Sequence, residues 1–309
     1  MLQKIKSSNP IFVGIALALI AVIIWSGNYV IARGIIHSVP PISVAFYRWF
    51  FACLVMLPLA YKSFKKDLPI LLQHKTYLFF TALTGVSIFN TFIYIAGHYT
   101  KAINLALIGT TGAPIIAIIL AAIFLKEILT LFRIIGMLIC IVGILVLLSQ
   151  GSWQRLSNFH FEKGDVLMFI SAFSFAVYNI LVRKKPSTIS SLSFLLCTFI
   201  IGTLVLVPFY IYELSVSTPV QWNSNLVFTF AYLAIGNSVI SFLCWNTAIK
   251  YLGAARTALF TNLIPIFSAI EAVFFINEKF TTVHLTSSLL IIGGLVVANF
   301  VKKKTTQIS

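Results

Sequence analysis

Charged residues are scarce in this sequence, and their scarcity excludes a water-soluble fold. Asp, Glu, Lys and Arg make up 9% of the 309 residues and hydrophobic residues make up 60%, whereas soluble globular proteins have about 25% and roughly 45–50%. So few charges cannot cover the surface of a soluble domain. Repeated apolar runs of about 20 residues are long enough to cross a bilayer core. The composition therefore predicts an all-α membrane protein that spans the lipid bilayer several times.

Cysteine, aspartate and histidine are also few, and none forms a recognisable chemical motif. The four cysteines lie inside apolar runs without a CxxC pair, which favours inert thiols over disulfides or metal ligands. The sequence contains no HExxH motif and no Walker-type GxxxxGK[ST] motif. The five histidines are scattered near the ends of apolar runs. We therefore expect no enzyme activity, no cofactor and no metal site.

The net charge of +15 is distributed as in a membrane protein, because the basic residues occupy short segments between apolar runs. We expect no nucleic-acid partner. Counted on alternate sides of the spans, sixteen Lys and Arg lie on one side and Arg48 lies within a span. The opposite side holds five, which are Arg33, Lys101, Arg155, Lys163 and Lys279. This asymmetry predicts a multi-pass protein of a bacterial-type inner membrane, with both termini in the cytoplasm.

Ten membrane spans are predicted, and the first is read as an uncleaved span because its apolar run is too long for a signal peptide. The spans cover residues 11–33, 41–61, 76–98, 101–125, 131–149, 164–183, 191–213, 225–248, 253–276 and 283–301. Breaks are expected at Pro40-Pro41, along Lys62–Lys75, at Lys126-Glu127, along Gln150–Lys163 and after Arg183. Such short connections make consecutive helices antiparallel neighbours.

The second half of the sequence repeats the first. Three pairs of landmark residues are each separated by 151 residues, namely Pro114 and Pro265, Glu127 and Glu278, and Gly143 and Gly294. We expect residues 14–149 and 164–300 to form two five-helix repeats, and an odd number of spans inverts the second copy. Inverted repeats around a mid-membrane site are a common architecture of secondary transporters. Duplication retained for packing alone is the alternative.

The order of these landmarks resembles the drug/metabolite transporter superfamily, EamA-type family. The residues that carry the resemblance are Trp25-Ser-Gly-Asn28, Arg48, Pro114, Glu127, Gly136 and Gly143, followed by Pro265, Glu278 and Gly294. The resemblance implies ten helices, with helices one to four and six to nine around a central substrate cavity. It also implies transport of small metabolites such as amino acids. The second half departs from the pattern, with Phe175, Tyr178 and Thr198 at the positions of Trp25, Asn28 and Arg48.

Arg48 is the strongest candidate for substrate binding, because a charged residue inside a span is costly and must face the interior of the bundle. Its planar guanidinium suits a substrate carboxylate. The alternatives are snorkelling towards the outer headgroups and a structural tie to carbonyl groups. Glu271 is the only acid well inside a span, at a depth similar to that of Arg48. We hypothesise that the two pair or share a cavity and that Glu271 couples transport to protons; a fixed ion pair or an interfacial glutamate is the alternative.

Aromatic and amide side chains complete the candidate substrate-binding set. Its predicted members are Trp25, Ser26, Asn28, Arg48, Asn90, Tyr94, Tyr178, Asn179, Trp245 and Asn246. Pairs spaced three or four residues apart, such as Trp25 with Asn28 and Asn90 with Tyr94, share a helix face. Faces of this composition suit amphipathic or aromatic organic solutes better than bare ions. The alternative for each residue is core packing or an interhelical hydrogen bond.

Two prolines and two glutamates recur at matching places in both halves. Pro114 and Pro265 each remove a backbone hydrogen bond in mid-span, so we expect helix kinks that act as gates or remain static. Glu127 and Glu278 close helices beside a lysine, which favours a capping or turn-stabilising role.

Taken together, the sequence predicts a secondary transporter that exports small organic metabolites, such as amino acids, by alternating access. A lipid or glycolipid flippase, or a channel-like permease on the same fold, is the alternative. The expected partners are a small-molecule substrate, the lipid bilayer and protons as a coupling ion.

Overall fold

A computed structural model describes residues 9–35, 38–100, 105, 108–152, 154, 157, 162–276 and 281–299. Helices account for the regular structure of this part of the chain, and no strand occurs in it. Nine of these helices are long and apolar enough to cross a membrane. Large apolar side chains such as Phe12, Ile123 and Phe228 are exposed on the outside of the bundle, as expected for a surface that faces lipid.

The first half of the chain begins with α1 (Pro10–Ile35) and α2 (Pro41–Gln73). The third span combines α3 (Lys75–Ala82), the π-helix η2 (Leu83–Ile88) and α4 (Phe89–Ala96). The π-helix η3 (Ile108–Gly112) leads into α6 (Ala113–Leu125), and α7 (Leu131–Ser149) follows. The π geometry inserts wider turns into the third and fourth spans, and such turns are frequent at functional sites.

The second half has the same order of spans. It contains α9 (Lys163–Arg183), α10 (Ser191–Val216), α11 (Ser224–Ala231), the π-helix η4 (Tyr232–Ile240), α12 (Ser241–Leu252), α13 (Ala254–Ala258), the 3₁₀-helix η5 (Leu259–Leu263), α14 (Ile264–Ile276) and α15 (Thr282–Asn299). The predicted span over residues 253–276 is present but interrupted, because η5 separates α13 from α14. Nine membrane-length helical segments are found in the described residues, and the segment over residues 253–276 is not among them.

The second helix is longer than predicted. The break expected along Lys62–Lys75 is wrong, because α2 continues without interruption to Gln73, through Pro69. The extension keeps one buried face, on which Asp67 is 6% and Leu71 3% exposed. Lysine is a good helix former, so a basic segment outside the apolar run is compatible with a helix whose buried face packs on the bundle.

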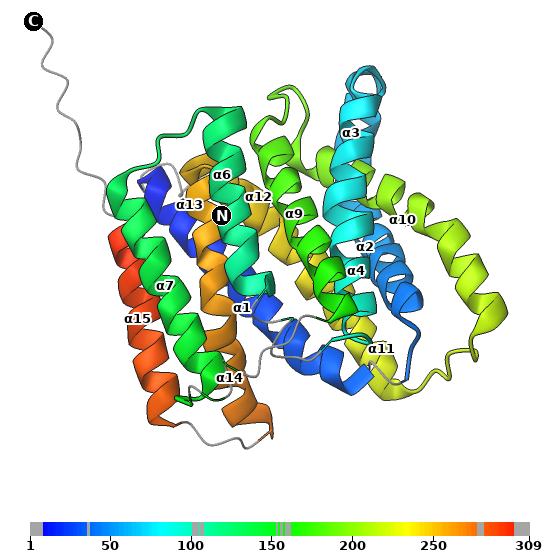
Figure 1. Cartoon of the computed structure of the whole chain (residues 1–309). Coiled ribbons are helices and arrows are strands. Elements are labelled where there is room, and N and C mark those ends of the chain that lie inside the picture. Colours follow the sequence, from blue (N-terminus) through cyan, green and yellow to red (C-terminus); the bar gives the residue numbers. More distant parts are fainter. Residues whose placement is uncertain are drawn as a thin grey trace, which may run out of the picture.

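The spans pack in pairs that link the two halves of the chain. In Figure 1, α7 and α15 lie side by side at one edge of the molecule, and α2, α3 and α10 lie at the opposite edge. Between these edges, α1 contacts α12 and α14, and α9 contacts α4 and α6. The central helices of the bundle are therefore α1 and α9, the first spans of the two halves.

Glycines allow α7 and α15 to approach closely. A Cβ atom added to Gly136 would lie 2.4 Å from the carbonyl oxygen of Gly294, and one added to Gly294 would lie 2.6 Å from that of Gly136. The Cys140 thiol, on the same face of α7, donates to the carbonyl of Ile291 at 3.4 Å. Small residues at a helix interface are a general device for helix association in membranes, where dispersion contacts replace the hydrophobic effect.

Each of the helices α2 and α10 caps the other. Near the end of α10, the Glu213 carboxylate accepts hydrogen bonds from the backbone N–H of Ile42 (3.0 Å) and Ser43 (2.6 Å) and from the Ser43 hydroxyl (2.7 Å). Near the end of α2, the Asp67 carboxylate accepts from the backbone N–H of Ser190 at 2.9 Å. Carboxylates are favourable at helix N-termini, where backbone N–H groups lack partners. The two helices are thereby joined at both ends.

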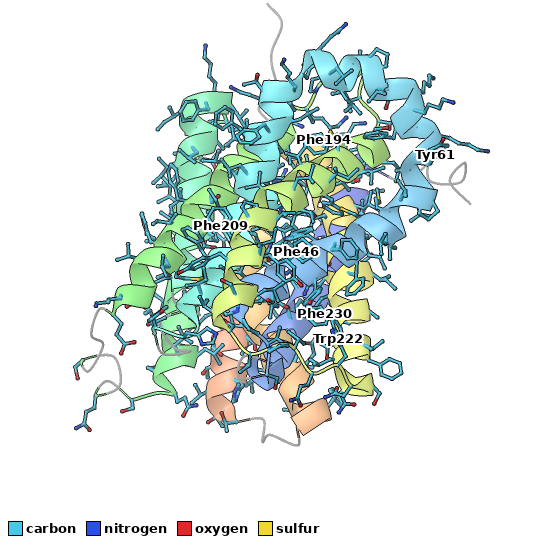
Figure 2. The ribbon with its side chains drawn as sticks, turned by 90° about the vertical axis from the view of Figure 1, so that its right-hand side faces the viewer. Phe46, Tyr61, Phe194, Phe209, Trp222 and Phe230 are labelled. Carbon is cyan, nitrogen blue, oxygen red and sulfur yellow. The ribbon has the colours of Figure 1, made fainter. Side chains whose placement is uncertain are left out.

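An aromatic cluster fixes the rotation of α2. Figure 2 shows Phe46, Trp222 and Phe230 gathered where α2, α10 and α11 meet. The ring centroid of Tyr47 lies 5.0 Å from that of Trp222, and its hydroxyl is 2.7 Å from that of Tyr210. Trp49, on another face, packs on Phe199 and Phe242 at 4.9 and 5.2 Å. Because both neighbours of Arg48 are anchored in this way, Arg48 is directed into the bundle.

Candidate functional site: a cavity between the two halves

A cavity of about 50 Å³ lies between the central helices. Its walls come from α1, α4, η3, α6, α9, η4, η5 and α14, so both halves of the chain contribute. The lining residues are Trp25, Asn28, Phe89, Asn90, Ile93, Gly109, Thr110, Ala113, Met168, Ala172, Phe175, Asn237, Thr261 and Ile264. The walls are mainly apolar and aromatic, with a few amide and hydroxyl groups, which is typical of sites for organic ligands.

Three of the ten predicted binding residues line this cavity, namely Trp25, Asn28 and Asn90. The other seven are not lining residues; six of them contact one another or a lining residue, and Ser26 donates to Glu271. They are Ser26, Arg48, Tyr94, Tyr178, Asn179, Trp245 and Asn246. The structure therefore brings the predicted set together around one site and divides it into lining residues and supporting residues.

Arg48 is 1% exposed and donates all of its N–H groups to neutral protein acceptors. Its Nε atom donates to the Ser238 hydroxyl at 2.8 Å, and Nη1 donates to Asn90 Oδ1 at 2.8 Å and to the Tyr94 hydroxyl at 3.0 Å. Nη2 donates to Asn237, to Oδ1 at 2.9 Å and to the backbone carbonyl at 3.3 Å. A guanidinium has five N–H donors, so a substrate carboxylate would have to displace these partners to bind Arg48 directly.

The π-helix η4 presents the Asn237 backbone carbonyl to two other helices. Wider π turns leave carbonyls outside the regular i→i+4 pattern, and that of Asn237 accepts from Trp25 Nε1 at 3.1 Å as well as from Arg48. The Ser238 and Ser241 hydroxyls bond to carbonyls five residues earlier, at 2.9 and 3.0 Å. In this way η4 places the Asn237 side chain in the cavity wall and its backbone behind that wall.

Aromatic side chains close one side of the cavity. Trp25 packs on Phe175, Trp245 and Phe242, with ring centroids 5.7, 4.9 and 5.8 Å apart. Trp245 Nε1 donates to Asn179 Oδ1 at 2.9 Å. These contacts hold the Trp25 indole in a fixed orientation against the lining residue Phe175.

Two more predicted residues support this aromatic wall from behind. The Tyr178 hydroxyl donates to Asn246 Oδ1 at 2.9 Å. The Tyr178 ring fits because position 85 is glycine, where an added Cβ would lie 2.1 Å from a ring carbon. Tyr178 and Asn246 therefore act on the cavity through the packing of the wall.

Glu271 lies beside α1 and does not pair with Arg48. Its Oε1 atom accepts from the Ser26 hydroxyl at 2.8 Å, and Oε2 is buried with no hydrogen-bond partner among the described residues. The Ser268 hydroxyl donates to the Ser26 carbonyl at 2.8 Å, which ties the same turn of α14 to α1. No ion pair links Arg48 to a carboxylate within the described part of the chain, so the hypothesised pair with Glu271 is absent from this structure.

Both prolines follow a helical segment that departs from α geometry. Pro114 is the second residue of α6, directly after the π-helix η3, and Pro265 is the second residue of α14, directly after the 3₁₀-helix η5. The expected interruption of the α-helix is thus found at both positions. Because η3 and η5 both line the cavity, a change in either segment would alter its walls; the gating role stays a prediction.

Glu127 accepts a hydrogen bond at the start of a helix in the other half. Its Oε1 atom accepts from the backbone N–H of Ala254 at 3.0 Å, and its Oε2 atom lies 3.8 Å from Arg133 Nη1. The predicted capping role is therefore seen, at the N-terminus of α13. The corresponding Glu278 lies outside the described residues.

Asn237 is the main site residue that sequence reasoning missed. It is an amide in mid-span between Gly236 and Ser238, so the rule that selected Asn90 also applies to it. Thr110 and Thr261 were likewise missed, although both line the cavity. The signal available in the sequence was their separation of 151 residues, the offset of the repeat.

The fold and the site together define a multi-pass helical membrane protein with a cavity between its central helices. The chain belongs to the EamA-like transporter family, whose model matches residues 12–149 and again residues 162–300. This places it in the drug/metabolite transporter superfamily, as the landmark residues predict. The family match indicates a transporter rather than an enzyme.

Several curated proteins are similar over most of the chain. An "Uncharacterized transporter" of Archaeoglobus fulgidus is 26% identical over 277 residues, 89% of this chain and 93% of the relative. A "Probable amino-acid metabolite efflux pump" of Escherichia coli is 23% identical over 294 residues, 92% of this chain and 94% of the relative. A solved crystal structure covers 93% of this chain and 96% of its own, with a TM-score of 0.75 at 17% identity. The last similarity shows that the fold is shared.

Proposed function

We propose that the protein is a secondary active transporter that exports small organic metabolites, amino acids or related compounds, by alternating access. It would lie in a bacterial-type inner membrane with both termini in the cytoplasm, the orientation that the basic residues favour. It would be built from two inverted five-helix repeats, residues 14–149 and 164–300. The efflux function named for the Escherichia coli relative supports this proposal.

The observation that carries the proposal is that residues at equivalent positions of the two repeats contact each other. Trp25 and Phe175 have ring centroids 5.7 Å apart. The Cys53 sulfur is 3.6 Å from the Thr203 hydroxyl, across 150 residues, and the Cys140 sulfur is 3.4 Å from the Ile291 carbonyl, across 151. Equivalent positions touch each other where they lie close to a two-fold axis. These contacts support a two-fold arrangement of the halves, with the axis passing beside the cavity.

Equivalent positions of the two repeats also line the cavity. Thr110 and Thr261 line it from η3 and η5, and Ala113 and Ile264 line it at the starts of α6 and α14. In each pair the two residues are separated by 151 positions. A site built from both repeats near mid-membrane is what alternating access requires, since either half can then open it to one side.

Counterflow in proteoliposomes tests the transport mechanism. Purified protein is reconstituted with a high internal concentration of one unlabelled metabolite, and entry of the same labelled metabolite is followed for a panel that includes the twenty amino acids. A carrier is expected to accumulate label transiently for at least one solute. Entry that never exceeds equilibrium would indicate a channel-like permease. Movement of labelled lipid, and of no metabolite, would indicate a flippase.

Coupling to protons is proposed to depend on Glu271. In Glu271→Gln the hydrogen bond from Ser26 is retained, while the group that exchanges a proton is removed. We expect uptake driven by an imposed pH gradient to fall at least about tenfold, whereas counterflow without a gradient continues. The measurement compares both assays in one vesicle preparation, with Glu162→Gln as a control near the membrane surface. Transport by Glu271→Gln that stays fully dependent on the gradient would remove Glu271 from the coupling step.

A further inference from the structure

The geometry points to Asn90 and Asn237 as the residues that bind the substrate, through their side-chain Nδ2 groups, and to Arg48 as the positioning residue behind them. We infer that these two amides select a solute with a carboxylate. The inference rests on the proposed transport function, which it extends by naming the donors and the group they recognise.

The orientation of both amides follows from the chemistry of arginine. A guanidinium can only donate hydrogen bonds, so the atom of each asparagine that faces Arg48 must be the carbonyl oxygen Oδ1. The distances are 2.8 Å from Nη1 to Asn90 Oδ1 and 2.9 Å from Nη2 to Asn237 Oδ1. Neither amide can rotate by 180° without placing an NH₂ group against the guanidinium. Arg48 therefore fixes the position of two NH₂ donors on two different helices, α4 and η4.

Those two donors are buried and have no hydrogen-bond partner among the described residues. Asn90 and Asn237 are 4% and 1% exposed, and both line the cavity. Buried polar atoms are almost always hydrogen-bonded in folded proteins. Two unpartnered donors on residues that line one small cavity favour a site for a group with two acceptor oxygens.

The charge of Arg48 favours an anionic group over a neutral one. No carboxylate pairs with the guanidinium within the described part of the chain, and its five acceptors are neutral. A buried charge without a counter-charge interacts strongly with an ion placed nearby, because screening inside the protein is weak. A carboxylate held by the two Nδ2 groups would be separated from the Arg48 guanidinium by the amide groups of the two asparagines. Its charge would then be balanced without displacing any hydrogen bond of Arg48.

The rest of the solute would meet a different environment. Asn28 lines the cavity, and its buried Oδ1 atom, which has no hydrogen-bond partner among the described residues, is an acceptor for an ammonium or other N–H group. Trp25, Phe89 and Phe175 offer aromatic faces. The arrangement thus fits a small α-amino acid or a close derivative with its carboxylate towards η4.

Asparagine-to-aspartate substitutions test this inference without breaking the arginine network. In Asn90→Asp and Asn237→Asp, one carboxylate oxygen still accepts from Arg48, while the other replaces the NH₂ donor with an acceptor of negative charge. Asn223→Asp is the matched control, because Asn223 caps α11 through Oδ1 at 2.9 Å, away from the cavity, and aspartate caps equally well.

The probes are three pairs of compounds that differ only in the carboxylate: L-alanine and L-alaninamide, L-leucine and L-leucinamide, and L-phenylalanine and L-phenylalaninamide. Binding is measured as the shift in thermal unfolding of purified protein in detergent, titrated with each compound. We expect at least one acid to bind wild-type protein and Asn223→Asp at least about tenfold more tightly than its amide. We expect Asn90→Asp and Asn237→Asp to lose this preference. In Arg48→Lys, which keeps the charge without the planar fork, the preference for the acid should fall.

Three results would overturn the inference: no acid preference in wild-type protein, an acid preference that survives both Asn→Asp substitutions, or one lost equally in Asn223→Asp. The transport proposal fails separately. If an acid binds in detergent but no solute exchanges across vesicles, the site stands and the carrier mechanism does not. If solutes without a carboxylate exchange and acids do not, the carrier mechanism stands and the donor assignment is wrong.

Discussion

Arg48→Met is expected to lower the free energy of unfolding by roughly 3 kcal/mol and to abolish transport. Methionine fills a similar volume but donates no hydrogen bond, so the acceptors on Asn90, Tyr94, Asn237 and Ser238 lose their shared partner. Polar contacts between helices in membranes contribute on average about 0.6 kcal/mol each. Five such contacts together give the expected loss. Transport is lost because the two asparagine amides are no longer held in one orientation.

The measurement is reversible unfolding in mixed micelles with increasing SDS, followed by counterflow on the folded fraction. Arg183→Met is the matched control, because the acceptors of Arg183 among the described residues are the carbonyls of Ile249 and Lys250, at 3.3 and 2.7 Å, near the ends of α9 and α12. The free energy of unfolding of Arg183→Met should fall by no more than about 1 kcal/mol, and the variant should still transport. Equal stability losses in the two variants, or full transport by Arg48→Met, would contradict a central role for Arg48.

Gly294→Leu is expected to destabilise the protein by about 2–4 kcal/mol, because α15 can no longer approach α7. The first atom of any side chain at position 294 would lie 2.6 Å from the Gly136 carbonyl oxygen and 2.8 Å from the Cys140 nitrogen. These contacts are with backbone atoms, so the helices must separate, and overpacking of this kind costs about 1–3 kcal/mol before other contacts are lost. Neither α7 nor α15 lines the cavity. Molecules that do fold should therefore still transport.

The neighbouring glycine provides the control. A Cβ added to Gly293 meets no atom within 4 Å, so Gly293→Leu adds the same side chain on a face of α15 with free space. We expect a change of less than about 0.5 kcal/mol in its free energy of unfolding. Thermal unfolding monitored by size-exclusion chromatography compares the two variants. A Gly294→Leu protein as stable as Gly293→Leu would show that α7 and α15 do not need this close approach.

The membrane spans were predictable because they depend on local properties. A span is recognised from its own apolar residues and their number, which is why nine of the ten predicted spans match membrane-length helical segments in the described part of the chain. The extension of α2 beyond residue 61 was not predicted. It depends on tertiary burial of Asp67 and Leu71, which the polar composition of the segment does not reveal.

The site was predictable only in part, for a geometric reason. The cost of burying polar groups in lipid directed attention to Arg48, Asn90 and Trp25, of which Asn90 and Trp25 line the cavity and Arg48 bonds to Asn90. The hydrogen-bond partners of Arg48, however, are 42 to 190 residues away along the chain. The π turns of η2, η3 and η4 rotate side chains relative to a regular helix, so helical spacing alone could not show that Asn237 lines the cavity while Arg48 lies behind it.

The reciprocal capping of α2 and α10 restricts how the cavity can open. If each half rotated as one block, α2 would slide against α10 and the hydrogen bonds at Glu213 and Asp67 would break. Because these bonds join helices of opposite halves at both ends, the α2–α10 pair is better suited to stay fixed while other helices move. Access to the cavity from the two sides of the membrane would then alternate through bending of the helices that face the α2–α10 pair. The segments around η3 and η5, where α geometry is already interrupted, would act as the hinges of that movement.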